Sequence, residues 1–294
     1  MKNRVERRYR VALILVLTFV TSAFADSHDG VGPLKDLHKK VEHLLEESTP
    51  EHPFYLHAEA RKHIEMGDAA FYMPTPFDEL SVALTEVANW CEILPLHLNV
   101  KGCVFDDAAD DAELTLFLGH KNYQSTEDAH RIDYEFSSEV ADGYFEARFY
   151  ADKGPLGTSD YRIEFEAMPA GDSTFARLRT SEHQSWISSK AMNVYLSTKG
   201  ADKRGISVVG HDDSGRPLYS AGEQGAIERN VLRYYFAVIA FFETMEQPDH
   251  SRFESALQEW FAATERYPQL YEMDQDEYLS AKSKERANQL ELQR

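Results

Sequence analysis

The stretch ERNVLRYYFAVIAFFETM, residues 228–245, decides the fold. Nine consecutive residues within it, 234–242, carry no charge, and five of the nine are aromatic. A membrane-spanning helix needs about 20 apolar residues, so this run is too short to be one. An ordinary surface helix shows one apolar stripe, whereas this helix would be apolar on nearly every side. We therefore expect it to be covered on several sides by the rest of the chain.

The first 25 residues have the three parts of a secretory signal peptide. The basic start MKNRVERRYR precedes the apolar core VALILVLTFV, and Ala23-Phe24-Ala25 matches the A-x-A cleavage pattern. We expect cleavage after Ala25, a periplasmic or secreted location, and no stable membrane span after cleavage. The whole chain has a formal net charge of −19, and such an acidic protein repels nucleic acid, so we expect no nucleic-acid partner.

After the signal peptide the chain predicts three parts. Residues 26–75 begin with an amphipathic helix and continue as an irregular segment that has prolines at both ends. Residues 76–246 start with a helix that is followed by strands. Residues 247–294 predict two further helices, for which the sequence indicates no specific role.

From residue 96 onwards the apolar period changes from 3.6 to 2, which is typical of strands. Turns such as ADG, DKGP, AGDS and DDSG separate the alternating segments and indicate hairpins. The sequence thus predicts an α+β fold in which a curved antiparallel sheet grips the long C-terminal helix, with additional helices at both ends. About seven strands are expected, beginning near residues 96, 114, 132, 145, 161, 175 and 206.

Four passages within residues 76–246 suggest a family. They are PFDELSVALTEVANWCEILP, GPLGTSDYRI, RTSEHQS and DDSGRPLYSAGEQGAIERN. Each resembles a motif of the START and polyketide-cyclase-like (SRPBCC, helix-grip) superfamily. The resemblance implies a helix-grip domain over these residues, with a lipid-sized cavity for a hydrophobic ligand such as a lipid, a sterol or a polyketide-like compound.

The candidate ligand contacts are aromatic and cationic side chains expected near that cavity. An arginine among aromatic rings at the cavity mouth would fix a carboxylate, a phosphate or a sterol hydroxyl. The alternative is that the arginines pair with Glu164, Glu166 or Glu228 and only join the helix to the sheet. The candidate ligand-binding residues are Tyr134, Phe149, Phe165, Arg177, Arg179, Arg233, Tyr234, Val238 and Phe241.

The long helix carries its own prediction. Tyr234, Val238, Phe241 and Met245 are spaced 4, 3 and 4 residues apart and should form one buried flank. This flank would be packed core, cavity wall, or both in different parts. Arg233 is rotated about 100° from the flank and should lie nearer the rim.

Motifs for catalysis are absent: the sequence has no G-x-S-x-G, H-E-x-x-H, C-x-x-C or P-loop pattern. His52, His57 and His63 lack the spacing of a metal site. The acidic run 106–113 lacks the glycine and the alternating ligands of a calcium loop. We expect no catalytic residue, no metal ligand and no cofactor.

Cys91 and Cys103 are the only cysteines. In an oxidising compartment they would close a small-loop disulfide worth about 3 kcal/mol. The alternative is a pair of buried thiols that never meet.

Three functions remain open from the sequence. We expect a protein that binds or carries a hydrophobic small molecule. A cyclase or hydrolase on the same scaffold would instead use a cavity acid such as Asp160, together with Tyr161 or Arg177, and would need a titratable cavity group without a structural partner. A structural or assembly factor would have a collapsed cavity and would use its C-terminal helices to bind a protein, which the sequence does not identify.

Overall fold

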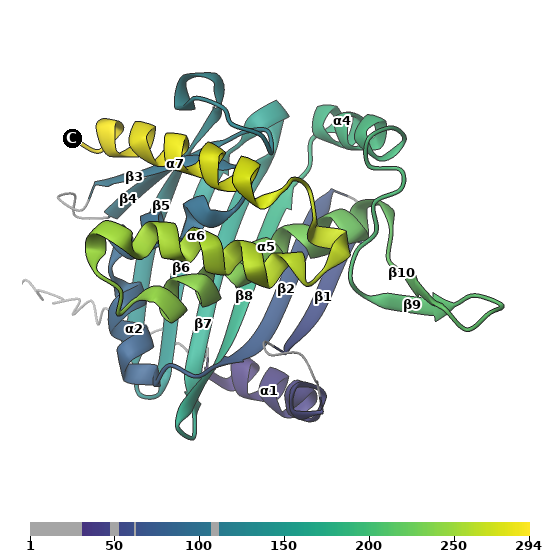
Figure 1. The fold of residues 1–294 in the computed structure, drawn as a ribbon. Helices are drawn as coiled ribbons and strands as arrows, with labels where there is room; N and C mark the ends of the chain where they lie inside the picture. Colours follow the sequence, from purple (N-terminus) through teal and green to yellow (C-terminus); the bar gives the residue numbers. More distant parts are fainter. Residues whose placement is uncertain (1–30, 48–52, 62, 107–111) are drawn as a thin grey trace, which may run out of the picture.

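The computed structural model describes residues 31–47, 53–61, 63–106 and 112–294. Its centre is an eight-stranded antiparallel sheet with the strand order β1-β2-β8-β7-β6-β5-β4-β3 (Figure 1). The strands are β1 (Phe54–Arg61), β2 (Ile64–Met73), β3 (Val100–Asp106), β4 (Ala112–Leu118), β5 (His130–Ala141), β6 (Tyr144–Lys153), β7 (Ser159–Ala170) and β8 (Ser173–His183). The expected signal peptide, His52 and most of the acidic run 106–113 lie outside the described residues.

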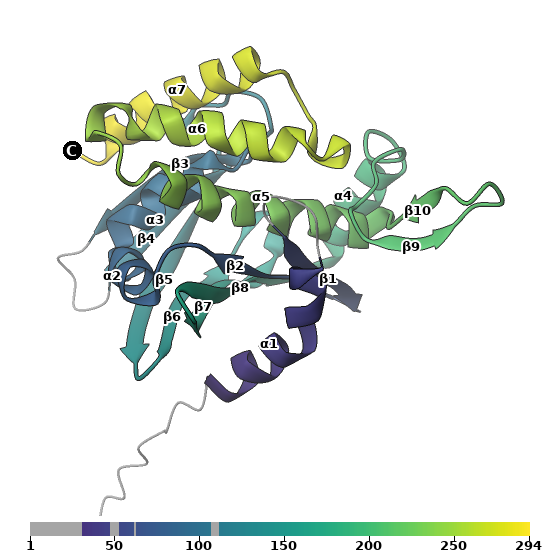
Figure 2. The same cartoon turned by 60° about the horizontal axis from the view of Figure 1, so that its bottom comes forward.

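Helices cover both faces of this sheet. Figure 2 shows α1 on one face and α5 on the other, with α6 and α7 as a further layer beyond α5. A small hairpin, β9 (Val208–His211) with β10 (Pro217–Tyr219), projects from the segment before α5. The helices are α1 (Val31–Glu46), α2 (Phe77–Thr85), α3 (Val87–Ile93), α4 (Trp186–Leu196), α5 (Gly222–Thr244), α6 (Asp249–Glu265) and α7 (Gln275–Leu292); the short 3-10 turns are η1 (Leu94–Leu96), η2 (Thr126–Asp128), η3 (Pro155–Gly157) and η4 (Pro268–Leu270).

Residues 228–244 form most of helix α5, and the sheet packs around this helix as expected. Every residue from 231 to 241 is buried, because the sheet covers one side of α5 and α6 covers the other (Figure 2). Tyr235 packs on Phe71 of β2, with 4.4 Å between ring centroids. The indole of Trp260 in α6 donates a hydrogen bond to the Arg233 carbonyl at 2.9 Å. The all-round apolar character of α5 therefore matches its position between two layers.

The expected flank is buried at three of its four positions. Tyr234, Val238 and Phe241 are at most 7% exposed, and Met245 is half-buried. The expectation that Arg233 lies nearer the rim is wrong, since this residue is only 4% exposed. Its guanidinium is buried because Glu272, in the loop before α7, pairs with it at 2.9 Å.

The segment expected to be irregular holds strands β1 and β2 instead, so that prediction is wrong. The two strands pair with each other, and β2 also pairs with β8 in the middle of the sheet. The period-2 pattern is missing from β2 because both of its faces are buried, one under α5 and one under α1. The sheet therefore begins before residue 76, the boundary expected from the family resemblance.

Two of the seven expected strands also lie elsewhere. Residues 94–96 form the 3-10 turn η1, and strand β3 begins only at Val100. The last expected strand, near residue 206, belongs to the β9–β10 hairpin and not to the main sheet. The main sheet thus consists of the five central strands that the sequence predicts, β3, and two strands that the sequence analysis misses.

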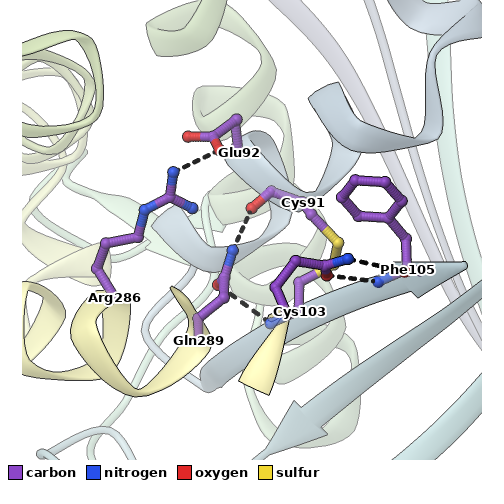
Figure 3. Close-up of a disulfide and its surroundings, with 7 residues drawn as sticks. Cys91, Glu92, Cys103, Phe105, Arg286 and Gln289 are labelled. Carbon is purple, nitrogen blue, oxygen red and sulfur yellow. Dashed lines mark hydrogen bonds and ion pairs between the residues drawn. A yellow bond between two sulfur atoms is a disulfide. The ribbon is translucent and has the colours of Figure 1, made fainter. Parts of the chain in front are cut away.

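Helix α7 covers the edge of the sheet that is formed by strand β3. Beside it, a disulfide joins Cys91 of α3 to Cys103 of β3 (Figure 3). The Gln289 amide donates to the Cys91 carbonyl at 3.0 Å and accepts from the Cys103 N–H at 3.1 Å. Gln293 makes the same two contacts with the backbone of Phe105. These side chains occupy backbone groups of β3 that an edge strand would otherwise leave open to another chain.

The disulfide should stabilise this corner of the molecule by about 3 kcal/mol, because it closes a short loop in the unfolded chain. We expect the double variant Cys91→Ala/Cys103→Ala to lower the free energy of unfolding by about that amount, measured by urea denaturation at equilibrium. An unchanged unfolding free energy would show that the two residues do not pair in the folded protein.

Candidate functional site

A cavity of about 1060 Å³ lies between the sheet, the first half of α5, and α4. Helix α5 lines it with residues between 226 and 234, and α4 with residues between 188 and 195. The sheet contributes the side chains of Tyr134, Tyr161, Ile163, Thr180 and Glu182. This volume is at the upper end of the range typical of small-molecule sites, about 300–1,000 Å³.

The cavity lies beside the first half of α5, whereas the second half packs into the core. Further along α5, Val238 and Phe241 belong to the packed core around Trp90. Near its start, α5 faces Gly67, where a Cβ atom would lie only 3.0 Å from Ile227. Gly67 therefore allows the helix to approach β2 closely, while the neighbouring strands leave space beside it.

A buried carboxylate holds the segment that connects α4 to α5. Glu228 of α5 accepts hydrogen bonds from the backbone N–H of Ile206 at 2.7 Å and of Ser207 at 3.0 Å, and from the Ser220 hydroxyl at 2.6 Å. Gly205 is required beside it, because a Cβ atom there would lie 2.2 Å from Glu228 Oε2. The wall of the cavity formed by α4 and the following loop is thus anchored to α5.

The candidate ligand contacts divide between this cavity and the core. Tyr134, Arg233 and Tyr234 line the cavity. Phe149 and Phe165 instead pack on Trp90, with ring centroids 5.0 and 5.8 Å away. Val238 and Phe241 lie in the same core and are at most 2% exposed.

Arg177 and Arg179 lie on the opposite face of the sheet, which α1 covers. Their Nε atoms donate to Asp68 at 2.8 and 2.9 Å, and Arg177 also pairs with Glu166 at 3.1 Å. Alternation along β8 places them with Phe175, which packs against α1. For these two arginines the structure therefore shows pairing, although the main partner is Asp68.

Asp160, the candidate catalytic acid of the enzyme hypothesis, also interacts with other side chains outside the cavity. Asp160 contacts His183 Nδ1 at 2.7 Å and accepts a hydrogen bond from Tyr150 at 3.2 Å. Neither Asp160 nor Arg177 lines the cavity. The cyclase or hydrolase hypothesis built on these residues thus loses its catalytic acid. Over the part of the chain that the structure describes, no group of three His, Cys, Asp or Glu is placed to hold a metal ion.

The cavity wall carries an acidic pair that sequence reasoning misses. Glu65 of β2 and Glu182 of β8 are directly opposite each other in the sheet register, and both line the cavity. Among the described residues neither carboxylate has an ion pair; Glu182 accepts a hydrogen bond from the Gln184 amide at 2.5 Å. Like charges directly opposite each other on neighbouring strands are unfavourable.

Burial and mutual repulsion change how this pair titrates. Burial, with the nearby charges of Glu182 and Glu223, raises the pKa of Glu65 from 4.5 to about 7. Burial also raises the pKa of Glu182, against the effect of a hydrogen bond from Tyr161. The pair therefore retains a proton near neutral pH that ordinary glutamates release.

A second group of charges in the cavity wall comes from α5 and from the loops after β4, after α4 and before α7. Arg233, Lys121 and Lys203 all pair with Glu272, and all four residues line the cavity. Burial alone would raise the pKa of Glu272, but the Arg233 charge and hydrogen bonds from the two lysines hold it at about 2. Three cations around one carboxylate leave an excess of positive charge on this wall.

Tyr134 and Tyr234 line the same cavity. They are 3% and 7% exposed, and neither hydroxyl makes a hydrogen bond within the described part of the chain. The Tyr234 ring stacks on His97 at 4.3 Å. Burial lowers the pKa of His97 well below its ordinary value, so this imidazole is neutral.

The missed residues had weak signals in the sequence. Glu182 lies within the motif RTSEHQS, but Glu65 falls in the segment that was expected to be irregular. Lys121, Lys203 and Glu272 come from three separate loops, and only the fold brings them together.

Several solved structures are similar to this chain. The Zhui aromatase/cyclase from Streptomyces sp. R1128 is 12% identical and covers 67% of this chain and 94% of its own, with a TM-score of 0.37. A START superfamily protein from Mycobacterium smegmatis is 13% identical and covers 48% and 94%, with a TM-score of 0.29. Human STARD10 is 9% identical and covers 55% and 74%, with a TM-score of 0.31. No family model matches the chain, and no curated protein matches it.

The antiparallel sheet and the long C-terminal helix that packs across it define a helix-grip fold. None of the described helices has both the length and the apolar content required to cross a membrane.

Two tryptophan substitutions should show which region of this protein is packed core and which borders the cavity. Val238→Trp overfills a packed region and should lower the free energy of unfolding by about 2 kcal/mol or more. Thr180→Trp adds volume beside empty space and should change it by less than about 0.5 kcal/mol. Thermal and urea denaturation measure both values. Equal losses for the two variants would mean that the cavity is filled in solution.

The acidic pair predicts a pH dependence of stability. The folded protein binds a proton at Glu65 more tightly than the unfolded chain does, so this contribution is complete below pH 4.5 and is lost as the pH rises through 7. Between pH 5 and pH 8 the free energy of unfolding of the wild-type protein should fall by about 2 kcal/mol relative to that of Glu65→Gln. The control variant Glu127→Gln removes an exposed carboxylate. Its unfolding free energy, plotted against pH, should run parallel to that of the wild type. Parallel curves for all three proteins would show that Glu65 titrates like an exposed glutamate.

Proposed function

We propose that this protein binds and carries a hydrophobic small molecule, such as a lipid, a sterol or a polyketide-like compound, in the cavity beside α5. The cavity of about 1060 Å³ carries this proposal, because a solid core would favour a structural role instead. Burying apolar ligand surface contributes about 25 cal/mol per Å². A chain that begins with a secretory signal pattern would do this work in the periplasm or outside the cell.

The wall suggests how such a ligand would be oriented. Tyr134 and Tyr234 offer aromatic surface together with hydroxyl groups, and Ile163 and Ile227 offer aliphatic surface. Arg233 is the one member of the three candidate arginines that reaches this space, and its Nε is buried without a hydrogen-bond partner among the described residues. The ligand we propose is therefore amphiphilic, with its apolar body against α5 and its polar groups against the charged walls.

The proposal is tested by native mass spectrometry of protein purified from an expressing cell, together with titration of a fluorescent fatty acid and a fluorescent sterol. We expect a retained small molecule, or saturable binding of one probe at one site per chain. Thr180→Trp should reduce binding at least tenfold, because the indole occupies the cavity. Val140→Trp, at an exposed position of β5, is the matched control and should bind normally.

Recovery of ligand-free protein that binds neither probe would contradict the carrier function. Binding that is insensitive to Thr180→Trp would place the ligand elsewhere on the protein.

A further inference from the structure

The acidic pair in the cavity has no partner to neutralise it. Glu65 and Glu182 face each other across neighbouring strands, and no cation of the described chain lies within ion-pair distance of either one. Burying unpaired carboxylates is costly, so proteins normally supply a cation or a proton. In this protein the positive side chains of the cavity are gathered around Glu272 instead.

A second, independent feature points into the same space. The Tyr134 hydroxyl is at the cavity surface in a residue that is 97% buried, and it has no hydrogen-bond partner among the described residues. Its electrostatic neighbours are Tyr161, Tyr234 and Glu182. A ligand atom in the cavity can form a hydrogen bond with this hydroxyl, which both donates and accepts.

We infer that the cavity takes a ligand with a protonated primary or secondary amine, which lies between Glu65 and Glu182 beside the hydroxyl of Tyr134. This assignment names the ligand class for the proposed carrier function and rests on it. An ammonium group carries the N–H donors that two carboxylates and a phenol oxygen accept, and it provides the missing positive charge. The tyrosine rings add attraction between the cation and their π faces.

The surroundings of the pair favour a cation over a neutral donor. Glu223 at the start of α5 adds a third negative charge that acts on Glu65. Just after β8, the Gln184 amide donates to Glu182 but brings no charge. Tyr161 on β7 is likewise neutral, since burial raises its pKa far above neutral pH. The proton that Glu65 retains near pH 7 competes with the ligand cation for this pair.

The test compares three ten-carbon probes: decylamine, decanol and decyltrimethylammonium. Binding of each to the full chain is measured by isothermal titration calorimetry at pH 6 and pH 8. At pH 8 we expect decylamine to bind about tenfold more tightly than decanol. One charge-assisted hydrogen bond contributes a ratio of about this size. Decyltrimethylammonium, which has the charge without N–H donors, should bind more weakly than decylamine.

The pH dependence gives a second readout. Because the amine must displace the proton of the pair, its affinity should rise about tenfold from pH 6 to pH 8, whereas that of decanol should not change. The variant Glu65→Gln/Glu182→Gln should lose both the preference for decylamine and its pH dependence while still binding decanol. These substitutions keep the side-chain shape and remove repulsion, and circular dichroism checks the fold. Glu164→Gln, which removes a carboxylate that does not line the cavity, is the control.

Equal affinity for decylamine and decanol, or a preference that survives in the double variant, would overturn the amine assignment and leave the carrier proposal standing. A preference for decyltrimethylammonium would also overturn it, in favour of a cation held without hydrogen bonds. If none of the three probes binds and the fluorescent fatty acid and sterol do not bind either, both proposals fail.

Discussion

The structure depends on covering α5 from two sides. A helix with eleven consecutive buried residues cannot face water on any side, so the sheet, α6 and the turn η1 all pack around it. Each large side chain of this helix contributes about 1.5–3 kcal/mol when fully buried. The C-terminal helices α6 and α7 are therefore part of the core. Trp260 and Tyr278 of α6 and α7 stack at 4.8 Å and extend that core beyond α5.

The same helix also creates the cavity, because its two halves differ. Beyond Tyr234, large side chains such as Tyr235, Val238 and Phe241 pack into the core with the aromatic residues of the sheet. The earlier residues of α5, such as Ala226 and Asn230, instead line the cavity opposite strand residues such as Tyr134, Ile163 and Thr180. The protein thus joins a rigid packed half to a half with space for a ligand. The disulfide and α7 hold the far edge of the sheet, away from the strands that carry the acidic pair.

The sequence predicted those parts of the fold that have a one-sided pattern. Strands β4 to β8 alternate because one face is covered more completely than the other, and α5 was recognised by its aromatic run. Strand β2 was missed because α1 and α5 bury both of its faces, which removes the alternation. Missing β2 also hid Glu65, so the acidic pair could not be predicted. The sequence does not exclude Arg177 and Arg179 as ligand contacts, because alternation alone does not tell which face of a sheet lines a cavity.

The central claim is that the first half of α5 borders a space which holds the apolar body of a ligand. A crystal structure of the protein with 10-bromodecylamine, recorded at the bromine absorption edge, tests it most directly. The account predicts one bromine peak inside the cavity beside α5, with the amine next to Glu65 and Glu182. Side chains that fill this space in the electron density, or bromine bound only at the outer surface, would contradict it.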